Sequence, residues 1–377
     1  MERPIRVAHV MGHMIGGGVE STVMNYYRHI DRSRVQFDFV VDADSTTVPR
    51  EEIRDLGGRV FVVPPYKRLP SYMTSCEKLF REQKPDIVHS NINALSVFPL
   101  RAARRAGVPL RIAHSHSTAN PREHKKTFLK NALRPLSRVE PTHLAACSDH
   151  AARWLFGDAA VDAGRVDIIR NAIDLDEFSF SPEVRVAKRA EIGVHDDQLV
   201  VGQVGRMCFQ KNQTFTLEVF AQLLRTRPDA VLVFVGDGEL MDGVRSRSRD
   251  LGVGESVRFL GIRDDVAQLY QAFDVLMFPS TYEGFGMAAV EAQSSGLPVV
   301  VSDQVPTEAC VVRELVHSLP LTNSQAWVES LMRVEPSRKR DFRSDELAVA
   351  GYRIDDAAVA LCDWYQSILH DGNGGAR

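Results

Sequence analysis

Long hydrophobic runs are absent from this sequence of 377 residues, and cysteine is scarce. No apolar run reaches the roughly 18 to 20 residues that a membrane-spanning helix needs, which argues against a helical membrane span. The first residues pass almost directly into a strand-like run, Ile5–Val10, so we expect no signal peptide. The five cysteines are scattered and form no CxxC pair, which argues against a disulfide framework or a zinc–thiolate site. We therefore expect a cytoplasmic protein with reduced thiols.

A strong net charge is also lacking, because the formal charge at pH 7 is only -3. The charge is nevertheless uneven, since ten Lys or Arg residues stand against two acidic ones between Arg101 and Glu140. The basic stretch 101–138 either lies on solvated helix faces or contacts phosphates or an anionic membrane surface. Contact with a membrane would place the protein peripherally at its inner face. Aromatic residues are not interleaved with these charges as on a single-strand platform, so we expect no nucleic-acid partner.

Short buried runs alternate with helical patterns along most of the chain, which has 44% hydrophobic residues. Such runs predict parallel sheets covered on both faces, and 377 residues suggest two domains. The pattern breaks around 171–182. We predict an α/β fold of two Rossmann-like domains, 1–178 and 179–349, facing each other across an interdomain cleft. An amphipathic helix at about 350–370 is expected to pack back onto the first domain. Ligands of such sheets lie at the carboxyl ends of the strands.

The stretch Ser280–Gly296 reads as a strand end, a turn and a helix over 286–295. Glu283 precedes this helix and Glu291 lies inside it; their directions differ by about 80° and they are roughly 12 Å apart along the axis. The turn 284–287 carries little side-chain bulk, so its backbone and the helix dipole can face an anion. The alternative is a first-turn Glu favoured by the dipole and a second Glu on a solvated face.

Two further turns follow predicted strands and suit an anionic ligand. Gly16–Gly18 allows close backbone approach, but it is neither GxGxxG nor a Walker A loop, and it could be a tight turn without a ligand. Arg206 and Lys211 leave the first strand of the second domain, where an Arg and a Lys suit a diphosphate. The alternative is that both residues are ordinary surface charges without a ligand.

Two histidines, His114 and His116, follow another predicted strand end. No Cys or acidic set completes a metal site around them, so we expect one of them to face the cleft and donate a hydrogen bond to a sugar hydroxyl. The sequence does not decide between the two. Asp42 and Asp44 form a DxD pattern that can hold a divalent metal against a diphosphate. Because Arg206, Lys211 and the helix dipole could stabilise a leaving diphosphate, we interpret these aspartates as loop residues and expect no metal.

The chain resembles the retaining GT-B glycosyltransferases of family GT4, especially their exopolysaccharide and capsular-polysaccharide branch. The resemblance spans residues 5 to 303. Its motifs are Gly16–Glu20, Arg111–His116, Ile169–Asp174, Val204–Asn212, Val235–Gly238, Phe259–Val266 and Pro279–Gly286, which continues to Glu291-Ala-Gln. The spacing of Glu283 and Glu291 in this strand-turn-helix context is fairly specific, whereas each glycine turn alone is a weak signal.

The resemblance implies a nucleotide-diphosphate sugar donor, with a UDP-sugar favoured over a GDP-sugar, and transfer with retained configuration and no cofactor or obligatory metal. The acceptor would be a glycan or a lipid-linked sugar in surface polysaccharide synthesis. Five sets of residues are then expected to form the site: Glu283 with the backbone of Gly284, Phe285, Gly286 and Met287 on the sugar, Glu291 on the ribose, Arg206 and Lys211 on the diphosphate, Gly16, Gly17 and Gly18 near the same phosphates, and His116 on the sugar.

One departure from the family pattern lies in this site. Phe285-Gly-Met287 replaces the Leu-Pro-x turn of the nearest branch, so the donor preference of that branch need not transfer. Two other functions also stay open: a sugar-nucleotide epimerase of the same fold, and a two-lobed sugar-binding protein, which would normally be exported.

Overall fold

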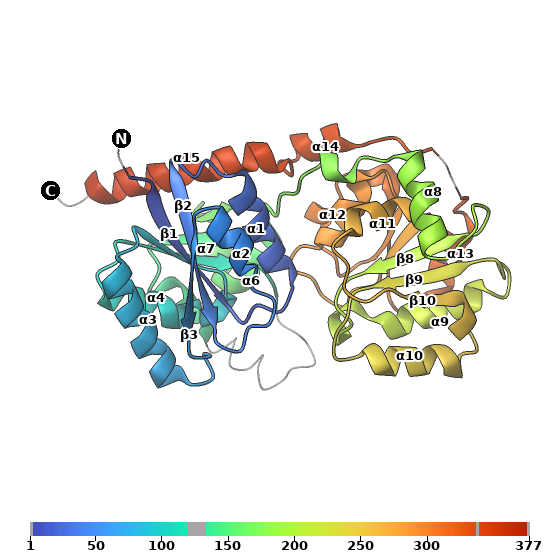
Figure 1. Cartoon of the computed structure of the whole chain (residues 1–377), viewed down its shortest axis with the longest axis horizontal. Coiled ribbons are helices and arrows are strands. Elements are labelled where there is room, and N and C mark those ends of the chain that lie inside the picture. Colours follow the sequence, from blue (N-terminus) through green and yellow to red (C-terminus); the bar gives the residue numbers. More distant parts are fainter. Residues whose placement is uncertain (1–2, 119–132, 337–338, 375–377) are drawn as a thin grey trace. The chain divides into compact units, whose positions relative to one another are not determined.

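The computed structural model describes residues 3–118, 133–336 and 339–374, with side chains as far as His370. The chain forms two compact units (Figure 1). Unit 1 contains Met1–Ile173 and Gly351–Arg377, and unit 2 contains Asp174–Ala350. The expected boundary after residue 178 lies slightly later than this division, because Phe178 is buried in unit 2 beside Tyr270, with 6.0 Å between ring centroids. No helix among the described residues is long and apolar enough to cross a bilayer.

Unit 1 is built on a seven-stranded parallel sheet of order β3-β2-β1-β4-β5-β6-β7. Its strands are β1 (Ile5–Gly12), β2 (Val35–Asp42), β3 (Arg59–Val63), β4 (Ile87–Ser90), β5 (Leu110–Ser115), β6 (His143–Ala146) and β7 (Val166–Ile168). Its α-helices are α1 (Gly18–His29), α2 (Arg50–Asp55), α3 (Leu69–Gln83), α4 (Val97–Arg105), α6 (Asp149–Phe156), α7 (Asp158–Asp162) and α15 (Ile354–Gly374).

The two faces of this sheet carry separate cores, because successive side chains of a strand point to opposite sides. One core contains Val7 of β1 and Phe37 of β2 together with α1 and α15. The other contains Ala8 and Val10 of β1 with α3, α4 and α6. The last helix, α15 (red in Figure 1), packs beside α1 on the first of these faces. The C-terminal segment therefore completes the core of unit 1.

Unit 2 is built on a six-stranded parallel sheet of order β10-β9-β8-β11-β12-β13. Its strands are β8 (Val200–Val204), β9 (Val231–Val235), β10 (Val257–Phe259), β11 (Val275–Phe278), β12 (Val299–Ser302) and β13 (Val316–Leu319). Its α-helices are α8 (Pro182–Glu191), α9 (Gln213–Leu223), α10 (Met241–Asp250), α11 (Val266–Ala272), α12 (Met287–Ser294), α13 (Ser324–Met332) and α14 (Ser344–Val349). Helices α9, α10 and α13 cover one face.

Both sheets have the doubly wound order that the alternating pattern predicts. In unit 1 the order reverses between β1 and β4, and in unit 2 between β8 and β11. A ligand-binding crevice forms at the carboxyl end of such a reversal, because the connections leave to opposite sides. The turns after β1, β4 and β5 therefore form one candidate edge in unit 1, and those after β8, β9 and β11 form another in unit 2. The prediction of two Rossmann-like α/β domains is confirmed.

Candidate active site

Glu283 lies in the turn between β11 and α12, at the candidate edge of unit 2. Its side chain is only 7% exposed. Lys211 Nζ lies 2.6 Å from Glu283 Oε1, and Gln210 Nε2 donates to Oε2 over 3.0 Å. Lys211 Nζ also lies 4.6 Å from the centroid of the Phe278 ring. The site therefore holds a largely buried ion pair in which each partner can exchange the other for a ligand of suitable charge.

The turn 284–287 is shaped by one glycine. Gly286 has φ +112°, in the left-handed region, and a Cβ there would lie 3.2 to 3.6 Å from Val305, Phe278 and Ala309. The α-helix starts one residue later, at Met287. Phe285 is buried, so its side chain belongs to the core and only its backbone faces the edge. The turn that follows Glu283 thus contributes backbone rather than a bulky exposed side chain to this edge.

Glu291 lies inside α12 and is only partly exposed. Tyr270 Oη donates a hydrogen bond to Glu291 Oε2 over 2.8 Å. Burial raises the pKa of this carboxyl, and the bond from Tyr270 opposes that rise. The alternative of a solvated Glu on an exposed helix face is therefore wrong for Glu291. Its carboxylate is held at a fixed place, and the chain has the local geometry to present it to a hydroxyl group.

Arg206 and Lys211 both follow β8, but they have different partners. Arg206 pairs with Glu239 over 3.0 Å, and its side chain is 49% exposed. Such an exposed pair is weak, on the order of 0 to 1 kcal/mol. The two cations share the carboxyl end of β8 without sharing a partner, so Arg206 has to turn away from Glu239 to meet an anion next to Lys211.

The glycine turn of unit 1 already binds a carboxylate. Glu20 Oε1 accepts from the backbone N–H of Ile15 over 2.9 Å, and Oε2 accepts from Gly16 and Gly17 over 2.5 and 2.6 Å. Backbone N–H groups that converge in this way form an anion-binding nest. The sequence predicts that Gly16–Gly18 approach phosphates, and the structure adds Glu20 as the internal anion with which a phosphate would compete.

His114 and His116 both lie at the end of β5, and their rings stack with 3.8 Å between centroids. His116 Nε2 lies 3.0 Å from Asn91 Oδ1, and its backbone N–H donates to Asn93 Oδ1 over 2.7 Å. Burial lowers the pKa of His116 to about 3 and that of His114 well below 6.5. Both rings are therefore neutral at pH 7, and the choice between them as the sugar contact stays a prediction.

The DxD pattern does not present two carboxylates together. Asp42 is buried, its carboxylate accepts from the Tyr66 N–H over 3.4 Å, and burial raises its pKa to about 6. Asp44 is exposed. Within the described residues, no group of three His, Cys, Asp or Glu side chains is arranged to hold a metal ion.

The basic stretch 101–138 is described only in part, since Arg122, Lys125, Lys126 and Lys130 lie outside the described residues. Arg101 and Arg104 both pair with the buried Glu140, over 2.9 and 3.1 Å. These two arginines therefore have a structural role in unit 1. By contrast, the 3-10 helix Arg134–Arg138 carries exposed Leu136, at 45%, and is followed by exposed Val139, at 59%.

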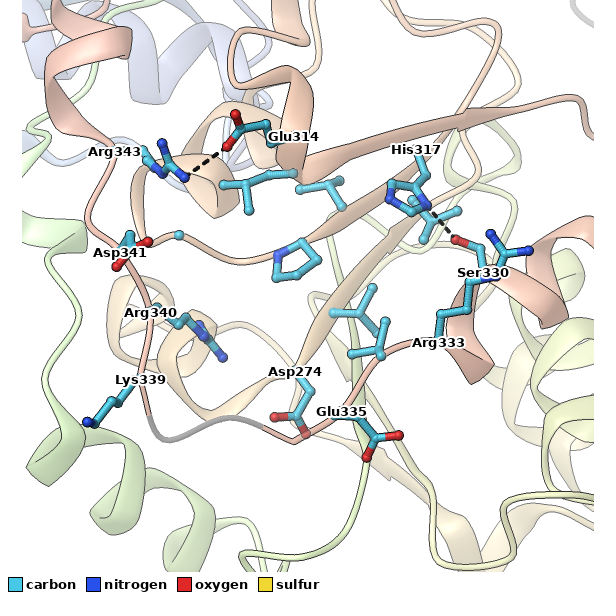
Figure 2. Close-up of a pocket in the computed structure, with 17 residues that line it drawn as sticks. Asp274, Glu314, His317, Ser330, Arg333, Glu335, Lys339, Arg340, Asp341 and Arg343 are labelled. Atoms are coloured by element: carbon cyan, nitrogen blue, oxygen red, sulfur yellow. Dashed lines mark hydrogen bonds and ion pairs between the residues drawn. The ribbon is translucent and has the colours of Figure 1, made fainter.

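A well-formed cavity in unit 2 lies away from these residues. It has a volume of about 380 Å³ and lies at the amino ends of β11 and β12, next to Asp274 and Pro298 (Figure 2). Polar side chains around it already have partners: Arg343 pairs with Glu314, and His317 with Ser330 (Figure 2). Because ligands of doubly wound sheets lie at the opposite edge, this cavity is not the candidate site.

Sequence reasoning missed several residues of the two edges. Gln210 and Tyr270 hold Glu283 and Glu291, Glu20 holds the glycine turn, and Asn91 holds His116. Of these, Glu20 carried a signal, since an acidic residue three positions after an N-cap commonly bonds back to it. Ile262, which lies in the motif Phe259–Val266, is 75% exposed in the turn after β10, next to Gly261, whose carbonyl accepts from the Gly236 N–H.

Comparisons with known proteins agree with this architecture. The family described as Glycosyltransferase Family 4 matches residues 16–177, and the family described as Glycosyl transferases group 1 matches residues 184–346. The chain is 34% identical over 368 residues to EpsF of Bacillus subtilis (strain 168), a protein named as a glycosyltransferase, and the match covers 96% of each chain. The protein belongs to the GT4 family of GT-B glycosyltransferases.

One further relative and one solved structure match nearly the whole length of this glycosyltransferase. It is 26% identical to the Escherichia coli UDP-Gal:alpha-D-GlcNAc-diphosphoundecaprenol alpha-1,3-galactosyltransferase, over 96% of each chain. The crystal structure of Anabaena Alr3699/HepE in complex with UDP and glucose superposes with a TM-score of 0.79 at 21% identity, covering 97% of this chain and 99% of that one. At that identity the likeness shows the GT-B fold alone.

Proposed function

We propose that this glycosyltransferase moves a sugar from a nucleotide-diphosphate sugar, with a UDP-sugar favoured, to a glycan or lipid-linked acceptor in surface polysaccharide synthesis, with retained configuration and without a metal. The observation that carries the proposal is the Lys211–Glu283 pair at the carboxyl edge of the unit 2 sheet. UDP and glucose are bound by HepE, and a lipid diphosphate-linked acceptor is named for the Escherichia coli relative; both support these ligand classes.

The chemistry proposed for this edge follows from the ion pair. In the transfer step the sugar carbon bonds to the acceptor oxygen, and the acceptor hydroxyl gives up its proton to the departing diphosphate or to water. The bond between the sugar carbon and the diphosphate oxygen breaks, and negative charge grows on that oxygen. Before this step, the bound diphosphate has drawn Lys211 from Glu283 and Arg206 from its weak pair with Glu239, so both cations are already in place. Glu283, freed from Lys211, accepts hydrogen bonds from sugar hydroxyls. Preorganised charge of this kind stabilises the transition state more than it does in water.

The remaining residues are proposed to contact other parts of the donor. Glu291, held by Tyr270, accepts a hydrogen bond from the ribose, and the backbone of Gly284–Met287 contacts the donor sugar. The exposed Ile262 beside Gly236 offers an apolar surface to the nucleobase. In unit 1, Gly16–Gly18 approach the phosphates in competition with Glu20, and His116 contacts the sugar.

A peripheral membrane contact is proposed for the exposed apolar residues Leu136 and Val139 with the exposed Arg138 beside them, whereas the Arg134 guanidinium lies 5.4 Å from the centroid of the Trp154 ring. A short amphipathic element of this kind can insert its apolar side chains at the headgroup level while its cations meet anionic lipids. Such docking at the inner face of the membrane would bring the enzyme to a lipid-linked acceptor.

A thermal-shift screen tests the donor class. The protein is heated with UDP, GDP, ADP and their common sugar conjugates, with and without EDTA. Ligand binding raises the unfolding temperature with the logarithm of ligand concentration over Kd, so micromolar binding is visible. We expect one nucleoside diphosphate to stabilise the protein equally with EDTA. Incubating its sugar conjugate without acceptor then separates transfer from epimerisation, since an epimerase would accumulate the rearranged sugar.

A further inference from the structure

Glu283 is bonded by two side chains that come from neighbouring positions of one short turn. Lys211 Nζ lies 2.6 Å from Oε1, and Gln210 Nε2 donates to Oε2 over 3.0 Å. Both residues belong to the 3-10 helix Phe209–Lys211, which follows β8. The carboxylate thus has one charged partner and one neutral partner, each on its own oxygen.

The orientation of the Gln210 amide follows from this partner. An ionised carboxylate can only accept hydrogen bonds, so the NH2 group of the amide must face Glu283. The amide has no net charge, so a diphosphate attracts it far less than it attracts the ammonium group of Lys211. The bond to Oε2 is therefore expected to stay in place when an anion draws Lys211 away from Oε1.

The backbone of Gln210 is anchored to the turn that carries Glu283. Its carbonyl oxygen accepts from the backbone N–H of Thr281 over 2.8 Å, and Thr281 Oγ1 also donates to it, over 3.3 Å. One residue later, the carbonyl of Lys211 accepts from the buried Gln203 of β8 over 2.6 Å. Because both backbone positions are held, the exchange of Glu283 for an anion can proceed by movement of the Lys211 side chain alone.

A carboxylate as buried as that of Glu283, whose side chain is 7% exposed, needs a donor to remain ionised. Removing one partner of a buried ion pair leaves an uncompensated charge, and such a carboxyl takes up a proton. A hydrogen bond that remains opposes this, because it stabilises the charged form. Gln210 is in place to supply that bond when Lys211 has left.

The other acidic residue of this edge has the same arrangement. Glu291 accepts on Oε2 from Tyr270 Oη, a neutral donor, over 2.8 Å. Burial raises the pKa of Glu291, the bond from Tyr270 and the charge of Lys211 lower it, and the charge of Glu177 adds to the rise. Lys211 thus acts on both carboxylates, and each carboxylate has a neutral donor that does not depend on Lys211.

We propose that Gln210 is a positioning residue that keeps Glu283 ionised and in place while Lys211 contacts the diphosphate of the donor. Its bond to Oε2 leaves Oε1, the oxygen that Lys211 releases, to accept from the hydroxyls of the donor sugar. Because the amide is neutral, the carboxylate keeps its full charge for that contact, whereas Lys or Arg at position 210 would neutralise it. This inference rests on the proposed function, because it concerns the same ion pair during donor binding.

Proton counting by calorimetry tests this role. UDP is titrated into wild type and Gln210→Met in two buffers with different heats of ionisation, and the difference in heat gives the protons taken up per UDP. Methionine keeps the length of the side chain but cannot donate. At about pH 6, Gln210→Met should take up as much as about one proton more than wild type, since burial raises the pKa of an unpaired carboxyl by up to about 3 to 5 units.

Two control variants locate the effect. Gln222→Met removes a partly buried amide of α9 that bonds the carbonyl of Glu218 over 3.2 Å, and it should match wild type. Adding Glu283→Gln to Gln210→Met should abolish the extra proton uptake, because an amide does not titrate. The Kd of UDP should rise about tenfold or more in Gln210→Met, the scale of one hydrogen bond to a charged group, and should not change in Gln222→Met.

Urea unfolding of a double-mutant cycle tests the same role without ligand. Lys211→Ala imitates the departure of Lys211, so Gln210 is left to hold Glu283. Gln210→Met should therefore lower the urea midpoint more in the Lys211→Ala background than in the wild-type background. An amide with a purely structural role would lower the midpoint equally in both backgrounds.

The outcomes separate this inference from the proposed function. Equal proton uptake by wild type and Gln210→Met, or extra uptake that persists after Glu283→Gln, would overturn the role of Gln210 during donor binding. Equal midpoint shifts in the two backgrounds would overturn it in the free protein. If UDP binds to none of these proteins, the proposed donor class fails, while the unfolding cycle still decides whether Gln210 holds Glu283.

Discussion

At the scale of single residues, the account depends on the pairing of Lys211 with Glu283. Both side chains are largely buried, and the carboxylate also accepts from Gln210. In a partly desolvated site each charge depends on the other, so an anion that attracts Lys211 releases Glu283 to a different partner. One ion pair can therefore serve the two ends of a sugar nucleotide, the diphosphate and the sugar.

We predict that Glu283→Gln and Lys211→Ala each lower kcat about 10²-fold or more, the scale of one lost transition-state contact. Arg206→Ala should act in the same direction. Steady-state transfer rates check this, with circular dichroism to confirm folding. Arg153→Ala, which removes a half-exposed cation of unit 1 bonded to Asp149, is the matched control. Near-wild-type rates in all three site variants would refute the assignment.

Asp42 gives a prediction about pH. Burial raises its pKa to about 6, above the ordinary value near 3.8. The folded state thus holds this proton more tightly, and the free energy of unfolding should fall as pH rises from about 4 to 6. Asp42→Asn removes the ionisation, so it should stabilise the protein at pH 7 by up to about 3 kcal/mol and by almost nothing near pH 4.

Urea unfolding of Asp42→Asn and wild type at the two pH values measures this difference. Because Asp42 is not part of the proposed site, the variant should keep its transfer rate, with or without EDTA. A variant that loses both activity and dependence on a divalent metal would instead revive the DxD interpretation of Asp42 and Asp44.

What sequence could predict at this scale follows from local spacing. Glu283 and Glu291 were placed correctly on a turn and a helix because strand, turn and helix signals adjoin them. The side chains that bond them were not predictable, since Tyr270 is 21 residues from Glu291 in the sequence and Gln210 is 73 residues from Glu283. The same holds for Tyr365, which meets His89 across 276 residues. Such contacts depend on packing, which no periodicity encodes.

At the scale of elements, the start of α12 is the critical feature. The sequence predicted a helix from residue 286, and the structure begins it at Met287 because Gly286 has a left-handed backbone. Most strands and helices were predictable, because buried β runs and helical periodicity are strong signals. The edge strand β13 was not predicted, because two of its four residues are exposed and it carries no buried run. The bonds from the glycine turn to Glu20 were not predicted, although the sequence shows an acidic residue three positions after Gly17.

We predict that Gly286→Ala destabilises unit 2 by about 1 to 2 kcal/mol, because φ +112° strains an L residue and the new Cβ approaches Val305 at 3.2 Å. Gly243→Ala in α10 is the matched control: nothing lies within 4 Å of a Cβ there, so the change should be neutral or stabilising. Thermal unfolding of both variants measures the contrast. If both variants were equally stable, the backbone at residue 286 would not require glycine, and the prediction would be wrong.

At the scale of the whole molecule, the proposed membrane contact gives the next prediction. Replacing Leu136 and Val139 by Ser should weaken binding to vesicles that contain anionic lipid by about tenfold, since two apolar side chains leave the interface. Binding should also fall with salt. The exposed Val349 of α14 provides the matched control, Val349→Ser. The proposal would be contradicted if the affinity for vesicles did not change with the anionic lipid content, with salt, or with replacement of the two apolar residues.

The most direct test of the central claim is calorimetric titration of UDP, in EDTA, into wild type, Lys211→Ala and Arg153→Ala. The claim is that the carboxyl edge of the unit 2 sheet binds the diphosphate of the donor through Lys211. We expect wild type and Arg153→Ala to bind with equal Kd, and Lys211→Ala to bind at least tenfold more weakly, the scale of one charge-assisted contact. Equal affinity in all three proteins would place the diphosphate elsewhere.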